Sequence, residues 1–146
     1  MLQPADFTIK KTCNIHMKKQ ILFSLILALC ACSLSAQNGY KEIIKILQRQ
    51  EADWNSGDIR SFMNGYWESD SLMFVGKTGI TYGYEHTLQR YLETYPDPEA
   101  MGKLTFDLLE FISLSSETFL LIGKWRLDRE EDTLEGHFSL IWRKIR

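Results

Sequence analysis

The stretch Trp54-Asn55-Ser56-Gly57-Asp58 constrains the fold of this chain most strongly, because it ends one amphipathic helix and begins another. Gly57 has no Cβ and can take the positive φ that ends a helix, while Asp58 is typical of an N-cap. Residues at helical spacing precede and follow the stretch: Tyr40, Ile43, Ile44, Leu47, Glu51 and Trp54 before it, and Ile59, Phe62, Met63, Tyr66 and Trp67 after it. The sequence therefore predicts two helices meeting at a sharp corner, with Trp54 and Tyr66 on the same side.

The rest of the domain reads as a short hairpin, a third helix and three long strands. The third helix begins after Gly83 and ends before Pro96. Alternating apolar residues predict the long strands, and the expected strand ranges are 72–75, 80–82, 104–114, 119–129 and 134–145. Helices first and a curled antiparallel sheet afterwards indicate an α+β domain in which the helices cover one apolar sheet face.

The first 36 residues have the sequence features of an N-terminal targeting segment, called the leader below. Lys18 and Lys19 precede an apolar run of eleven residues, Ile21 to Ala31, and small residues end at Ala36. Eleven helical residues span only about 16 Å, too short for a bilayer core of about 30 Å. We therefore expect an over-extended start before Met17, a signal peptide over 17–36 and an exported protein that begins at Gln37. The alternative is a lipoprotein anchored at Cys32.

The composition of residues 37–146 limits the kinds of site and partner that this domain can have. All three cysteines lie in the leader, so residues 37–146 have neither a disulfide nor a cysteine metal site. These residues hold 13 Lys and Arg (17 less four in the leader) against 18 Asp and Glu (19 less Asp6), a net charge near −5. With no basic patch, nucleic acid is not an expected partner. About 110 residues make one domain.

The layout resembles the nuclear transport factor 2-like superfamily, and within it the SnoaL-like group of small bacterial proteins. The residues that carry the likeness are Trp54-x-x-Gly57-Asp58, Gly83-x-Glu85 at the start of the third helix, the stretch 95–106 and Gly123-Lys124-Trp125. The resemblance implies three N-terminal helices on a curled sheet, forming a cone with an apolar pocket. The superfamily holds both enzymes and non-catalytic binding modules.

Aromatic residues are the main indication of a ligand pocket, since such pockets are apolar with a few polar groups. We expect it to be lined by Gln50, Trp54, Tyr66, Phe74, Tyr82, Trp125, Phe138, Leu140 and Trp142. No cofactor is expected, and no His, Asp and Glu spacing suggests a metal site.

Glu110 is the candidate catalytic residue, because it interrupts the apolar face between Leu108 and Ile112. A carboxylate there would be desolvated and suited to acid or base chemistry. The alternative is that a bulge or strand curvature turns Glu110 outward. Glu51 is a similar polar residue on the first helix stripe, but near a helix end.

Ketosteroid isomerase is the relative whose chemistry can be compared residue by residue. That reaction needs an Asp base and, as oxyanion donors, a Tyr and a protonated Asp. The resemblance aligns the Asp base with Phe74 or its neighbour, the Tyr with Gln50, and the protonated Asp with a position near Leu140. Since none of the three residues is kept, that isomerisation is not expected.

The last expectation concerns the C-terminal strand. Members of the resembled group continue into a sixth strand with an Asp-His-Ser/Thr motif, whereas this sequence ends at Trp142-Arg143-Lys144-Ile145-Arg146. We therefore expect the last strand to be missing, leaving a strand edge that favours association and a marginally stable domain.

Taken with the leader, these features predict an exported domain that binds a small, largely apolar molecule. One alternative is a lyase, isomerase or cyclase that uses Glu110 as acid or base, with Gln50 or Tyr66 as hydrogen-bond donor. The other is a module that forms a homodimer or binds a partner through its sheet. No transmembrane span is expected.

Overall fold

The computed structural model describes residues 20, 23 and 37–145. The chain divides into two compact units, Met1–Asn38 and Gly39–Arg146. The predicted leader lies almost entirely outside the described residues, and the fold below is that of the second unit. In the described part of the chain, no helix is long and apolar enough to cross a membrane.

The predicted corner is confirmed. Residues 37–55 are helical, and those from 39 onward belong to the second unit. Gly57 has a φ of 84°, and the Asp58 carboxylate accepts a hydrogen bond from the N–H of Ser61 at 2.9 Å. This cap starts α2 (Ile59–Met63), which ends earlier than predicted, because the chain turns at Asn64 and Gly65. Trp54 and Tyr66 belong to the same packed cluster.

A hairpin and two further helices follow α2. Strand β1 (Met73–Gly76) pairs antiparallel with β2 (Gly79–Tyr82), and α3 spans Tyr84–Thr94. A short helix, α4 (Pro98–Met101), occupies the region where the sequence analysis predicted only an end of helix. Pro98 fits the first helical turn, where no N–H partner is needed, and Asp97 caps Ala100. The described second unit therefore has four helices rather than three.

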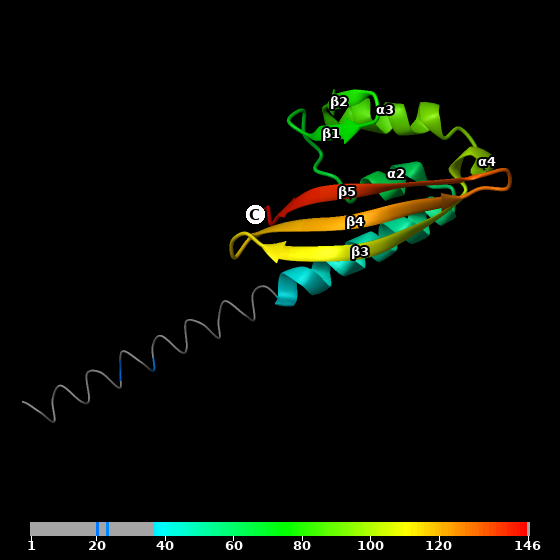
Figure 1. Cartoon of the computed structure of the whole chain (residues 1–146). Helices are drawn as coiled ribbons and strands as arrows, with labels where there is room; N and C mark the ends of the chain where they lie inside the picture. The colour runs from blue at the N-terminus through cyan, green and yellow to red at the C-terminus, as the bar shows by residue number, and fades with distance from the viewer. Residues whose placement is uncertain (1–19, 21–22, 24–36, 146) are drawn as a thin grey trace, which may run out of the picture. The chain divides into compact units, whose positions relative to one another are not determined.

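The three long strands form one antiparallel sheet in the order β3-β4-β5. They span Lys103–Ser113, Thr118–Asp128 and Thr133–Arg143. In Figure 1 the layer of β1, β2 and α3 lies above β5. The alternation predicted for β4 and β5 is confirmed, since Phe119, Leu121 and Leu127 are buried while His137 and Ser139 are exposed.

A β-bulge in β3 overturns part of the predicted alternation. Leu108 pairs with Gly123 and Glu110 with Ile122, so Leu109 is an extra residue without a partner. An extra residue moves every later side chain to the opposite sheet face. Phe111 therefore packs in the core, whereas Ile112, predicted to face inward, is 43% exposed. Leu114 was also predicted inward and is exposed.

Side chains of the first helix cover the outer edge of β3. Asn55 accepts a hydrogen bond from the N–H of Leu104 at 2.7 Å and donates one to the Leu104 carbonyl at 3.0 Å. Glu51 accepts from the N–H of Phe106 at 3.0 Å. Glu51 is a polar residue on the apolar stripe of the first helix. It therefore gives a hydrogen-bond partner to a backbone N–H on a strand edge that would otherwise be open.

Candidate functional site

The inner face of the β3-β4-β5 sheet, the face turned toward the helices, is made of apolar side chains and glycine. Its β5 residues Leu134, Phe138, Leu140 and Trp142 are only half-buried, although they pack against the core clusters. This part of the inner face is therefore incompletely covered by the helices.

Two glycines let aromatic rings lie flat on this face. Gly123 pairs with Phe138 across β4 and β5, and Trp125 pairs with Gly136. A Cβ on Gly123 would lie 2.9 Å from Cε1 of Phe138, and one on Gly136 would lie 2.9 Å from Cζ2 of Trp125. Each ring thus occupies the space that a side chain would need on the neighbouring strand.

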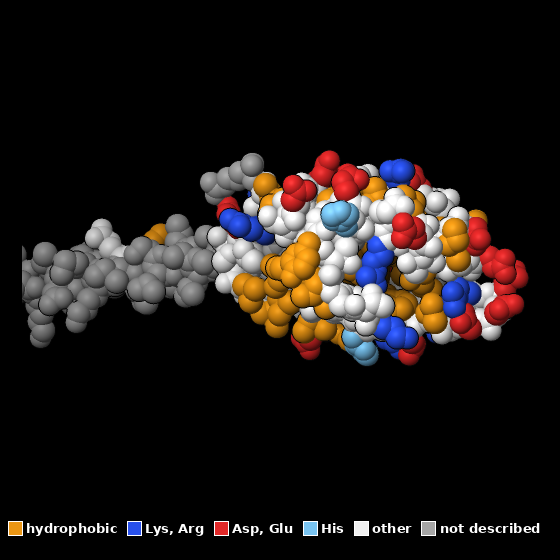
Figure 2. Space-filling model, turned by 90° about the horizontal axis from the view of Figure 1, so that it is seen from above, with side chains coloured by type: hydrophobic (Ala, Val, Ile, Leu, Met, Phe, Trp, Pro, Cys, Tyr) orange, Lys and Arg blue, Asp and Glu red, His pale blue; other side chains and the backbone are white. Residues whose placement is uncertain are grey.

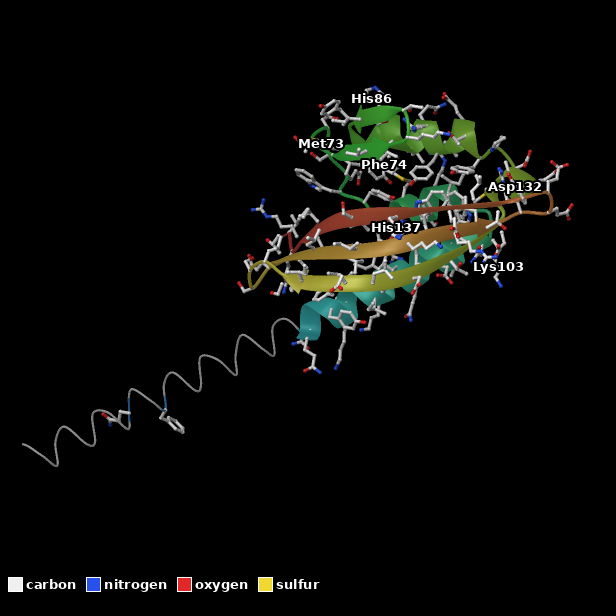
Figure 3. The ribbon with its side chains drawn as sticks, viewed as in Figure 1. Met73, Phe74, His86, Lys103, Asp132 and His137 are labelled. Carbon is white, nitrogen blue, oxygen red and sulfur yellow. The ribbon has the colours of Figure 1, made fainter. Side chains whose placement is uncertain are left out.

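An aromatic group from three elements stands opposite the sheet. The rings of Tyr66 and Phe74 are 6.5 Å apart, and Tyr91 of α3 lies 5.6 Å from Phe74. In Figure 3 Phe74 lies on the sheet-facing side of β1. Arg90 lies 5.9 Å from the Phe74 ring centroid and donates to the hydroxyl of Thr81.

The polar feature of this aromatic group is a pair of partly buried hydroxyls. Tyr66 Oη and Tyr91 Oη are 3.1 Å apart. Burial is the main cause that raises the pKa of Tyr66 above the ordinary tyrosine value and the pKa of Tyr91 well above it. Neither hydroxyl has another hydrogen-bond partner within residues 37–145. Because one hydrogen bond uses one proton, the pair retains one O–H donor without an acceptor there.

Sequence analysis missed Tyr91 as a site residue. It lies within the predicted third helix, and its ring packs against the core cluster that contains Trp54 and Phe62. The feature that could have identified Tyr91 as a site residue is its hydroxyl, because a tyrosine hydroxyl taken out of water generally needs a hydrogen-bond partner.

The structure brings several predicted pocket residues onto the inner face, but in two groups. Tyr66 and Trp125 pack with a first core cluster, which is built around Trp54 and Met63. Phe138, Leu140 and Trp142 pack with a second core cluster, which is built around Ile43, Leu47, Phe119 and Leu121. Phe106 contacts both clusters, and its ring lies 5.6 Å from that of Phe138. Within the described residues, the buried indole Nε1 of Trp142 has no hydrogen-bond partner.

Gln50 and Trp54 have structural partners. Gln50 is buried and donates to the Phe62 carbonyl at 3.0 Å. Trp54 Nε1 points to the carbonyls of Met101 and Gly102, at 3.4 and 3.3 Å. These contacts fasten α2 and the α4–β3 junction to the first helix.

Two predicted site residues lie away from the inner face. Tyr82 is 58% exposed and pairs with exposed Met73 on the outer side of the hairpin. Glu110 is also exposed, because the bulge turns it to the outer sheet face beside Ile122. The expectation of a desolvated Glu110 is therefore wrong, and the outward alternative describes its position.

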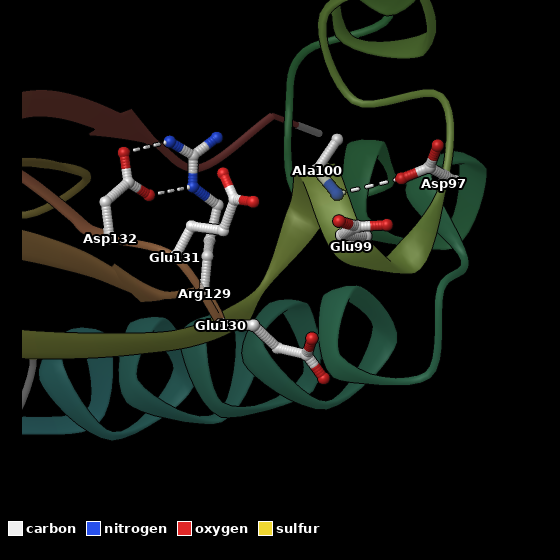
Figure 4. A pocket seen from close by; sticks show the side chains of 7 residues that line it. All are labelled: Asp97, Glu99, Ala100, Arg129, Glu130, Glu131 and Asp132. Carbon is white, nitrogen blue, oxygen red and sulfur yellow. Dashed lines mark hydrogen bonds and ion pairs between the residues drawn. The ribbon is translucent and has the colours of Figure 1, made fainter.

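Two surface depressions lie at the α4 end of the sheet, away from Tyr66 and Tyr91. One, of about 290 Å³, is lined by Asp97, Glu99, Ala100, Arg129, Glu130, Glu131 and Asp132 (Figure 4). Its ion pair is bidentate, with two Arg129–Asp132 contacts of 2.6 Å that lower the pKa of Asp132. The other, of about 700 Å³, adjoins it along the Trp54–Gly57 corner. Both are partly polar, and residues from turns and helix ends contribute to each lining.

Exposed apolar side chains are a further feature of the surface. Figure 2, seen from above, shows them gathered mainly in one patch. The most exposed in the second unit are Met73, Val75 and Ile141. Among the residues that the structure describes, no group of three or more His, Cys, Asp and Glu could hold a metal ion.

Known proteins resemble the chain chiefly in structure. An NTF2-like protein of unknown function from Shewanella oneidensis MR-1 is 36% identical, with a TM-score of 0.70 over 73% of this chain and 88% of that protein. An NTF2-like protein of unknown function from Pseudomonas putida KT2440 is 14% identical, with a TM-score of 0.56 over 73% and 77% of the two chains. A ketosteroid isomerase-like protein from Erwinia carotovora atroseptica SCRI1043 is 13% identical, with a TM-score of 0.51 over 70% and 82%.

The last two similarities concern the fold alone. No family model matches the chain, and no curated protein matches it.

Proposed function

We propose, from the premise that this chain belongs to the NTF2-like family, that it binds a small, largely apolar molecule on the inner face of the β3-β4-β5 sheet. The observation that carries the proposal is the partly buried Tyr66–Tyr91 hydroxyl pair, which retains one hydrogen-bond donor inside an aromatic group. An unused buried donor costs free energy unless a partner reaches it. A ligand acceptor would supply that partner.

The surroundings restrict the chemistry of the ligand. The hydroxyl pair belongs to a cluster of aromatic rings that also holds the half-buried side chains Trp125 of β4 and Leu134 of β5. Such surfaces favour apolar molecules, with the few polar groups fixing orientation. Because a phenol donates without carrying charge, the expected ligand group is a neutral acceptor, such as a ketone or ester carbonyl.

The enzyme alternative lacks a supporting observation. It required a desolvated Glu110, and Glu110 is exposed on the outer face. Gln50, one of its two suggested donors, already donates to the Phe62 carbonyl. The other, Tyr66, has no acid or base group opposite it in the Tyr66–Tyr91 pair. Binding is therefore the function that the arrangement favours.

Binding can be tested with matched pairs of small aromatic compounds that differ only by a carbonyl group. We expect the carbonyl compound of a pair to bind more tightly, and its titration to change the tryptophan emission, because Trp125 lies on the same face. In Tyr91→Phe the pair loses one hydroxyl, and the remaining one can donate directly. The variant should therefore still bind, whereas Tyr66→Phe/Tyr91→Phe should lose the preference for the carbonyl compound.

The matched control is Tyr82→Phe, which removes an exposed hydroxyl from the outer side of the hairpin. It should bind as the unmodified protein does. If the double variant keeps the full preference for the carbonyl compound, the hydroxyl pair is not the ligand's donor.

A further inference from the structure

Arg90 of α3 is a partly buried cation that has no carboxylate partner in the described part of the chain. Its Nη1 donates to the hydroxyl of Thr81 at 3.2 Å, and its Cζ lies 5.9 Å from the centroid of the Phe74 ring. Glu93, one helical turn further along α3, accepts a hydrogen bond from Gln89 at 2.9 Å instead. Removing a charge even partly from water costs free energy unless an opposite charge or hydrogen bonds compensate for it. Arg90 is therefore a cation with capacity for an anionic partner.

Most of the hydrogen-bonding capacity of Arg90 is unused. A guanidinium carries five N–H donors in a planar fork. Among the residues that the structure describes, Thr81 is its only hydrogen-bond acceptor. The contact with the Phe74 ring attracts the positive charge but accepts none of these donors in a conventional hydrogen bond. The guanidinium thus remains able to bind a planar group with two acceptor atoms.

The end of the β1–β2 hairpin leaves room beside this guanidinium. Gly76 and Gly79 pair across the two strands, so neither strand places a side chain there. A Cβ on Gly76 would lie 3.0 Å from Nη2 of Arg90, whereas one on Gly79 would meet nothing within 4 Å. Gly76 therefore allows the guanidinium to lie close to the β1 backbone, and the space next to Gly79 is open.

The same aromatic ring contacts both this cation and the tyrosine pair. The Phe74 ring lies 5.6 Å from the ring of Tyr91 and 6.5 Å from that of Tyr66. Phe74 stands opposite Thr81 in the hairpin register, so both side chains lie on one face of the hairpin. This is the sheet-facing side, on which Figure 3 shows Phe74. The group that holds Arg90 is therefore continuous with the aromatic group opposite the sheet.

We propose that Arg90 binds a carboxylate of the ligand, so that the ligand is an apolar carboxylic acid that also carries the neutral acceptor for the tyrosine pair. The assignment rests on the proposed function, because the inner face holds the apolar body of the same molecule. The guanidinium fork matches the two oxygens of a carboxylate. A phosphate monoester fits less well, because it carries nearly two negative charges at neutral pH and Arg90 supplies one positive charge.

Two compounds that differ in charge test the carboxylate site: para-benzoylbenzoate and its neutral amide, para-benzoylbenzamide. Both carry a ketone on the same aromatic body, so both offer an acceptor to the tyrosine pair. Isothermal titration calorimetry on the full chain should give a dissociation constant about tenfold or more lower for the carboxylate, because its hydrogen bonds to Arg90 are charge-assisted. Arg90→Gln should abolish this difference and leave the affinity for the amide within about twofold. Arg90→Lys keeps the charge without the fork and should give an intermediate preference.

Arg126→Gln is the matched control, because Arg126 is exposed on β4 and already pairs with Asp128 at 2.7 Å. It should keep the full preference for the carboxylate, and circular dichroism verifies that each variant is folded. Equal binding of the two compounds to the unmodified protein, or a carboxylate preference that persists in Arg90→Gln, would overturn the carboxylate site and leave the proposed function standing. If neither compound binds, both the carboxylate site and the proposed function are contradicted.

Discussion

The Tyr66 and Tyr91 hydroxyls share one hydrogen bond, so their energetic role depends on what else reaches them. Without a ligand, one donor is left over in a partly buried site. Aromatic packing, mostly edge-to-face or tilted, stabilises the position of the pair, since Tyr91 lies within 6.3 Å of Phe62, Tyr66, Phe74 and Tyr95 by ring centroids. The pair is therefore held in place before any ligand binds.

Burial of this pair predicts a loss of stability at alkaline pH. The folded state raises the pKa of Tyr91 well above the ordinary value of 10.0, mainly by burial, so it favours the neutral phenol. The corresponding stabilisation is complete below about pH 10 and is lost as the pH rises toward the folded-state pKa. We expect urea-unfolding free energies to fall above about pH 10, and to fall less steeply in Tyr91→Phe. An unchanged slope in this variant would contradict the assignment, and Tyr82→Phe controls for losing an exposed phenol.

Gly123 carries a second prediction at this scale. An alanine Cβ there would lie 2.9 Å from the Asp107 carbonyl oxygen and would also meet the Phe138 ring. Overpacking of this kind costs about 1–3 kcal/mol. We expect Gly123→Ala to lose about that much unfolding free energy in urea titrations, while Ser139→Ala, at an exposed position of β5, stays within about 0.5 kcal/mol. Equal stabilities for the two variants would mean that Phe138 can move away from Gly123.

At the scale of elements, the first helix covers the β3 edge through side-chain hydrogen bonds. Asn55→Ala removes both bonds to Leu104, which should cost about 1–2 kcal/mol of unfolding free energy. Hydrogen exchange should show faster exchange of the Leu104 amide, because its acceptor is lost. Gln48→Ala, exposed on the same helix, should change neither quantity. Unchanged Leu104 protection in Asn55→Ala would mean that another group covers the edge.

The elements also show which structural features a sequence pattern can predict and which it cannot. Gly57 and Asp58 act through local conformation and capping, so the corner was predictable. The strict alternation of β4 and β5 likewise predicted their buried faces. The bulge at Leu109 was not predictable from alternation, because Leu108, Leu109 and Phe111 are all apolar and fit two registers. Its consequence, the outward turn of Glu110, depends on pairing with β4.

The site was predictable only in part for a similar reason. The sequence identified aromatic residues, but not which face of a strand or hairpin they occupy. Tyr82 and Phe74 lie on opposite faces of the same hairpin, one exposed and one packed with Tyr66. The Tyr66–Tyr91 bond joins residues from separate elements, which periodicity within one element does not show.

At the scale of the whole molecule, the leader expected from the sequence leads us to propose where the protein functions. Lys18, Lys19 and the apolar run that follows lead us to expect export and an N-terminus at Gln37. N-terminal sequencing of the protein from its own cells measures this directly. A lipid-modified Cys32 in the membrane fraction, or an intact Met17 in the cytoplasm, would contradict cleavage after Ala36.

The central claim about this protein is that the inner face of the sheet holds a small molecule. Native mass spectrometry of the protein purified from its own cells tests that claim most directly. We predict an added mass that is removed by denaturation, belongs to a largely apolar compound with a neutral hydrogen-bond acceptor, and is lost in Tyr66→Phe/Tyr91→Phe but kept in Tyr82→Phe. A bare polypeptide mass, together with no response to the carbonyl compounds, would contradict it.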